Sequence, residues 1–181
     1  MGRPESTLQR INALTLLTAG LLLSGCAGYK LGPTNGVVAR DKSVQINPFS
    51  DQTLQPRVTD AVAQQLRKEL QRDGTYKIAT HNDGDIILSG AIIRYQRYEV
   101  SFASNDILTV QDYRLVLSAS VIARERSTGK VILERGDNNP VVGNTIIRVG
   151  SDLTSAERQA MPLLAQDLAR NVTALLVDGS W

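Results

Sequence analysis

With 181 residues, one cysteine, one histidine and a formal net charge of +2, the chain is too weakly basic for a general nucleic-acid binder and has too few thiols for a disulfide framework. The single histidine, His81, has neither a cysteine nor clustered carboxylates beside it in the sequence. No metal centre and no pair of nucleophile and base is therefore indicated. We expect no enzyme, no metal and no nucleic-acid partner.

The first 25 residues have the layout of a secretory signal peptide. Arg3 and Arg10 precede an apolar run, 11–23, that is shorter than the roughly 20 residues needed to cross a hydrocarbon core. The run ends in Leu-Ser-Gly-Cys, which resembles a bacterial lipobox. The resemblance implies that residues 1–25 are removed and that Cys26 carries a diacylglyceryl group and an N-acyl chain such as palmitate. The alternative is an ordinary signal peptide cleaved near Ala27.

Removal of the leader leaves about 156 residues, enough for one domain with a real core, and lowers the net charge to about +1. Glycine and proline are frequent in 26–42, which favours an acylated tether, although Tyr29-Lys30-Leu31 is compatible with a short edge strand. We expect residues 43–181 to form a single domain.

In the first half of this domain, the sequence pattern predicts a strand, then a helix, then a second strand. Ser43 to Ile46 alternates as a strand does, and Asn47-Pro48 ends it. Pro56 suits the first position of a helix that Gly74 ends. One apolar stripe follows the helical period, at Val58, Ala61, Val62, Leu66 and Leu70. Tyr76 to Thr80 predicts the next strand.

The region from Asp85 to Leu133 has the composition and alternation of β-structure. Gly90 interrupts the strand predicted over 85–102 and marks a bulge or a close approach of another chain segment. Over 112–124 the residues Tyr113, Leu115, Leu117, Ala119, Val121 and Ala123 alternate with mostly polar residues, so one face of that strand is expected to be buried and the other wet. Residues 127–130 predict a turn that leads into a strand at 131–133, which gives a hairpin. Gly136 to Gly150 is typical of a loop, with a possible short strand at 141–142 and 146–147.

The last element is a helix with a capping box at Thr154 and Glu157 and an apolar stripe from Ala160 to Leu176. Pro162 should kink this helix or mark its real start. The order of elements predicts an α+β fold in two layers, with two helices packed on one face of a mostly antiparallel sheet of about four to five strands.

These landmarks together resemble the LPS-assembly lipoproteins of the outer membrane. The matching segments cover nearly all of the mature chain in the right order: Cys26 to Leu31, Val44 to Phe49, Thr53 with Pro56, Asp85 to Gly90, Asp112 to Leu115, Thr128 to Val131 and Ala156 to Leu176. Members often carry aromatic residues after the hairpin, whereas 136–140 has none here.

The resemblance implies a lipid-anchored protein that plugs a large outer-membrane β-barrel and contacts lipopolysaccharide (LPS) during its transfer to the cell surface. Ala27, rather than Asp, after the cysteine resembles the sorting pattern for the outer membrane, with the domain on the periplasmic face. A strand ending in Pro48-Phe49 also resembles lipoproteins that build secretion pores or activate peptidoglycan synthases, and this remains the alternative.

Basic residues are the expected contacts with lipid phosphates, because the guanidinium fork makes paired, charge-assisted hydrogen bonds. The candidates on strands or turns are Arg94, Arg97, Arg114, Arg124, Arg126, Lys130 and Arg135. Arg94 with Arg97, and Arg126 with Lys130, are favoured because they cluster near Tyr95, Tyr98 and the hairpin turn. For any single arginine, an exposed position with scattered ion pairs is the simpler interpretation.

Overall fold

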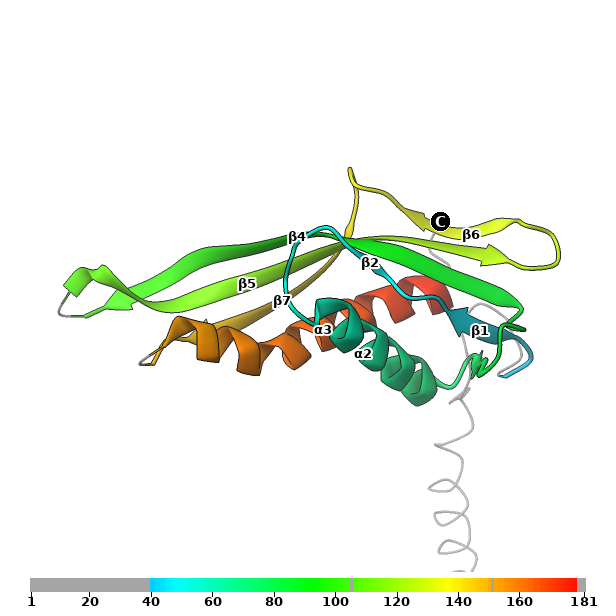
Figure 1. Ribbon diagram of the computed structural model, residues 1–181, viewed down its shortest axis with the longest axis horizontal. Helices are drawn as coiled ribbons and strands as arrows, with labels where there is room; N and C mark the ends of the chain where they lie inside the picture. The colour runs from blue at the N-terminus through cyan, green and yellow to red at the C-terminus, as the bar shows by residue number, and fades with distance from the viewer. Residues whose placement is uncertain (1–39, 105, 151, 179–181) are drawn as a thin grey trace, which may run out of the picture. The chain divides into compact units, whose positions relative to one another are not determined.

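A computed structural model describes residues 40–104, 106–150 and 152–178 (Figure 1). Within these ranges the chain forms two helices, α2 (Val58–Asp73) and α3 (Leu153–Asp178). The seven strands are β1 (Ser43–Ile46), β2 (Ser50–Asp51), β3 (Lys77–Ile78), β4 (Ile86–Ala103), β5 (Asp106–Glu125), β6 (Val131–Arg135) and β7 (Val141–Arg148). The expected leader, 1–25, and Cys26 lie outside the described residues.

The sheet is built on the long antiparallel hairpin of β4 and β5. Strands β1 and β2 lie parallel to β4 along its other edge, and β3 is parallel to β1. Strands β6 and β7 both pair antiparallel with β5, one after the other along the same edge. The expectation of four to five mostly antiparallel strands was therefore wrong: the sheet has seven and is mixed. The parallel pairs arise because the chain passes through α2 between β2 and β4, and such a crossover brings strands together in parallel.

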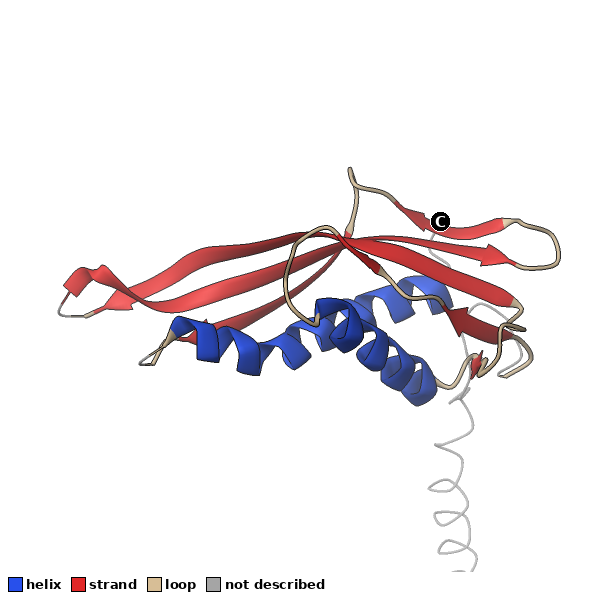
Figure 2. Cartoon of the chain, in the orientation of Figure 1, coloured by secondary structure: helices blue, strands red, loops and turns tan. Residues whose placement is uncertain are grey.

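Both helices lie on the same side of the sheet, which confirms the predicted α+β class (Figure 2). The buried apolar side chains come mainly from this side of the sheet and from the two helical stripes, and Leu66, Leu117 and Leu168 have no exposed area. The buried face predicted for 112–124 is present, since Leu115, Leu117, Ala119, Val121 and Ala123 are all buried. The opposite side of the sheet carries no described helix.

Gly90 is a point of close approach, as predicted. A β-carbon there would overlap the ring of Phe49 and lie 2.5 Å from the carbonyl oxygen of Ser120. The bulge, which was the other prediction for Gly90, lies instead between Ile92 and Arg94. Phe49 is thereby buried across the middle of β4 and helps to join β1 and β2 to the hairpin.

Strand β7 joins the two short stretches, 141–142 and 146–147, at which a strand was predicted as possible within the loop-like region, and α3 covers its outer edge. The backbone N–H of Asn144 donates to the Asp167 carboxylate at 2.9 Å, and the Asn171 amide donates to the Val142 carbonyl at 2.7 Å. Side chains of the helix therefore satisfy backbone groups that an open edge strand leaves unpaired.

The ends of the helices agree only in part with the sequence signals. Gly74 ends α2 in the left-handed conformation, as predicted, and its N–H donates to the Leu70 carbonyl. Asp152 rather than Thr154 caps α3, because its carboxylate accepts the N–H groups of Thr154 and Ser155 at 3.1 and 2.9 Å. Pro162 lies inside α3 and does not mark its start.

The last residues of the expected tether, 40–42, lie against the domain. The N–H of Arg40 donates to the Thr75 carbonyl at 2.7 Å, and the Lys42 carbonyl accepts from the N–H of Lys77 at 3.0 Å. These residues continue the edge of the sheet next to β3.

Candidate functional site

The side of β4, β5 and β7 that points away from the helices carries cationic and apolar side chains together. We call this the outer face and define it by Arg94, Tyr98, Arg114, Val142 and Ile146. In the register of the sheet, Tyr98 of β4 and Ile146 of β7 flank Arg114 of β5. Arg94 and Val142 flank Ser118 in the same way. The face is therefore one continuous surface across three strands.

The outer face is exposed and its arginines are unengaged. Tyr98, Ile146 and Val142 keep 49%, 57% and 39% of their surface exposed. Among the described residues, neither Arg94 nor Arg114 makes a side-chain hydrogen bond or ion pair. Free guanidinium groups beside apolar surface can bind an amphiphile, because the cations take its anionic groups and the apolar side chains take its hydrocarbon.

Arg97 does not share this surface with Arg94. It pairs with Leu115, whose side chain is buried, so it points to the helix side of the sheet. There its guanidinium forms an ion pair with Glu157 of α3 at 3.1 Å. Tyr95 lies on the same side with a buried hydroxyl that has no hydrogen-bond partner in the described part of the chain. Burial, with the nearby Glu157 charge, raises the pKa of Tyr95 well above its usual range.

Arg126 holds the end of β5 against the loop before β4. Its Nε donates to the Gly84 carbonyl at 2.7 Å, and its terminal nitrogen donates to the side chain of Gln45. The backbone N–H of Arg126 donates to the Asp85 carbonyl at 2.8 Å. These bonds give Arg126 a structural role in joining the hairpin to β1 and β4.

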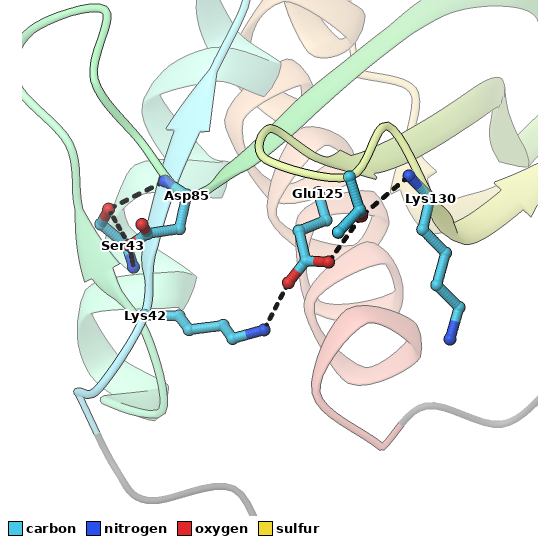
Figure 3. Close-up of polar contacts among 6 residues, drawn as sticks. Lys42, Ser43, Asp85, Glu125 and Lys130 are labelled. Atoms are coloured by element: carbon cyan, nitrogen blue, oxygen red, sulfur yellow. Dashed lines mark hydrogen bonds and ion pairs between the residues drawn. The ribbon is translucent and has the colours of Figure 1, made fainter.

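Lys130 lies at the turn between β5 and β6, and its ammonium has no partner among the residues that the structure describes. Figure 3 shows the Lys130 side chain pointing away from Glu125. The Glu125 carboxylate instead accepts from Lys42 at 2.7 Å and from the Thr128 hydroxyl at 2.7 Å. The hydrogen bond from Lys42 is the main reason that the pKa of Glu125 lies below its usual value.

The structure thus separates the four favoured basic residues. Arg94 and Arg97 are on opposite sides of the sheet, and Arg126 is bound to the loop before β4. Lys130 lies beyond the end of β5, whereas Arg94 pairs with Ser118, so about 23 Å of strand lies between the two cations. Of the other candidates, Arg114 joins Arg94 on the outer face, and Arg135 lines an open depression of about 400 Å³ beside the end of α3.

Two more observations concern metal ligands and helix hydropathy in the described residues. In 40–104, 106–150 and 152–178, no group of three or more histidine, cysteine, aspartate or glutamate side chains is placed to hold a metal ion. None of the helices in those ranges combines the length and hydropathy that a membrane-crossing helix needs.

Residues 42–176 match the model of a protein family described as LptE, lipopolysaccharide-assembly. No curated protein matches the sequence. Among solved structures, the chain is similar to protein XCC0632 from Xanthomonas campestris, with a TM-score of 0.56 and 10% identity over 83% of this chain and 91% of that one. It is also similar to the hypothetical protein CT253 from Chlamydia trachomatis, with a TM-score of 0.51 and 10% identity over 74% and 94% of the two chains. At such low identity these similarities show a shared fold.

Proposed function

Because the chain belongs to the lipopolysaccharide-assembly family LptE, we propose that it is an outer-membrane lipoprotein that partners the LPS-translocating β-barrel and contacts LPS during its assembly at the cell surface. The observation that carries the proposal is the family match over 42–176, which runs from the residue before β1 almost to the end of α3. The proposed role is one of binding and assembly, with no catalytic step.

We propose that Cys26 attaches the domain to the inner leaflet of the outer membrane, on the periplasmic face. Each buried methylene of an acyl chain contributes about 0.8 kcal/mol, and a single chain anchors only marginally. A cysteine with a diacylglyceryl group and an N-acyl chain would hold the domain there almost permanently. The domain itself would then sit in the lumen of the barrel, whose polar inner wall accepts a hydrated protein surface.

The outer face is the surface that we assign to LPS. Its free arginines, Arg94 and Arg114, suit the phosphates of the lipid, and Tyr98 and Ile146 on either side of Arg114 suit the first part of an acyl chain. Arg97 and Arg126 already have partners within the domain and are weaker candidates. Lys130 is a separate cation, too far from Arg94 for both to reach one phosphate.

The experiment is LPS binding by the double variant Arg94→Glu with Arg114→Glu. We expect its affinity to fall roughly tenfold or more, because each substitution replaces a charge-assisted contact with repulsion. The loss should shrink as salt is added. The matched control is Lys68→Glu with Lys77→Glu, which makes the same change of charge on exposed positions of α2 and β3. Equal weakening in both variants, or none in the first, would reject the outer face as the LPS contact.

A further inference from the structure

The turn between β2 and α2 displays a leucine in an unusual way. Leu54 is 92% exposed, and its φ of 60° lies in the left-handed region. Among the described residues, the other large exposed apolar side chains, such as Leu108 at 87% and Leu163 at 59%, have ordinary backbone conformations. The conformation is strained for a leucine, because its β-carbon crowds the backbone there, whereas glycine or asparagine accepts it readily.

The fold does not explain a leucine at this position. A side chain that is 92% exposed contributes almost nothing to the core, and an exposed leucine does not improve solubility. Glycine or asparagine would suit both the backbone and the solvent better. Leu54 is thus unfavourable in the free protein both for its backbone conformation and for its exposed apolar side chain. This indicates that the side chain contacts another molecule.

The turn that carries Leu54 is fixed by hydrogen bonds. The Asp51 carboxylate accepts both the N–H and the hydroxyl of Thr53 at 2.7 Å, and the Thr53 hydroxyl accepts the N–H of Gln55 at 3.4 Å. Just before the turn, the N–H of Gln52 donates to the carbonyl of Ile92 in β4 at 2.9 Å. The backbone that carries the leucine is therefore held in place before any contact is made, which lowers the backbone entropy lost on binding.

We propose that Leu54 is an anchor residue that inserts into an apolar pocket of a protein partner, the barrel subunit of the function proposed above, on which this inference rests. A single apolar side chain on a fixed backbone suits a shaped pocket, and a few buried side chains carry most of the binding energy in many protein interfaces. A bilayer gives no reason for a fixed backbone, and the polar residues Asp51, Thr53 and Gln55 around the leucine would resist insertion into it.

The test replaces the side chain with residues that suit the backbone better. In the full-length acylated protein purified from membranes, Leu54→Gly and Leu54→Asn should keep or raise the unfolding temperature. They should also retain about ten- to one-hundred-fold less of the co-purifying barrel, as expected when one buried leucine is lost from an interface. The control is Leu163→Asn on α3, which removes an exposed leucine of ordinary conformation and should capture the barrel as the wild type does.

The outcomes separate this inference from the proposed function. Capture of the barrel by the wild type and equally by Leu54→Gly would overturn the anchor and leave the function standing. A fall in unfolding temperature would overturn it as well, since the leucine would then support the fold. If the wild type captures no barrel, both fail. A photo-crosslinking residue at position 54 should give an adduct with the barrel in cells, and adducts with phospholipid alone would overturn the assignment to a protein.

Discussion

Replacement of Gly143 by alanine should separate α3 from the sheet. Gly143 lies in β7 directly against the helix, and a β-carbon there would stand 2.5 Å from the Leu168 backbone nitrogen and 2.7 Å from its α-carbon. Real contacts of a β-carbon essentially never fall below 3.0 Å. The opposing atoms are main chain of a buried helical residue, so no side-chain rotation can relieve the overlap.

The expected loss follows from the energetics of overpacking. One extra carbon in a well-packed core costs about 1–3 kcal/mol, because neighbouring segments must shift. For a domain of this size, that corresponds to a fall of roughly 3–10 °C in the unfolding temperature. Thermal unfolding followed by circular dichroism measures it directly. The variant should also unfold at a lower urea concentration without a large change in the slope.

Gly136→Ala is the matched control for Gly143→Ala. A β-carbon at Gly136 would meet no atom within 4 Å, and its φ is not in the left-handed region. Alanine there should be neutral or should stabilise by about 0.4–1 kcal/mol, through the smaller entropy of the unfolded chain. If Gly143→Ala and Gly136→Ala melt at the same temperature as the wild type, the close packing of α3 on β7 is refuted.

Two further predictions concern local hydrogen bonds. Asp152→Ala removes the cap of α3 and should lower the unfolding temperature by roughly 2–4 °C at pH 7. Thr154→Ala should lower it less. The opposite order of the two variants in thermal melts would contradict the assignment of the cap to Asp152. The Asp85 carboxylate accepts the N–H and the hydroxyl of Ser43, and these hydrogen bonds lower the pKa of Asp85 from its ordinary value of 3.8. The stability that the ionised carboxylate contributes is therefore present above pH 3.8 and is lost as the pH falls through the lowered pKa of the folded state. Asp85→Asn should therefore melt below the wild type at neutral pH, and the two curves should converge in acid; a constant difference down to the lowest pH would exclude the ionised carboxylate as the cause.

Much of the fold could be predicted because the signals are local and periodic. The apolar stripes of α2 and α3 and the alternation in 112–124 each repeat several times, so single exceptions do not hide them. Strand β7 was not predicted with its full length, because a glycine in its centre is typical of a loop. A glycine is needed at position 143 because the backbone of α3, far away in the sequence, lies against it. The residues next to Gly143 in the sequence do not indicate this contact. The parallel pairing of β1 and β2 with β4 is likewise a long-range property.

The sequence predicted which types of residue form the candidate site. It did not predict which of them lie on the same face of the sheet. Arg94 and Arg97 are three positions apart, and the twofold period of a strand puts such residues on opposite sides, so their proximity in sequence was misleading. The pairing of Arg114 with Ile146 depended on the existence of β7 and on its register. Nothing in the sequence around Leu54 indicates a left-handed residue, because leucine is not a residue that normally occupies that conformation.

The central claim is tested most directly by affinity purification of the full-length protein from membranes, with quantitative mass spectrometry of its partner and of its amino terminus. The account predicts one large outer-membrane barrel for each copy of the protein, and a Cys26 that carries a diacylglyceryl group and an N-acyl chain. A homo-oligomeric ring, a peptidoglycan synthase in place of the barrel, or a mature protein without lipid would contradict it.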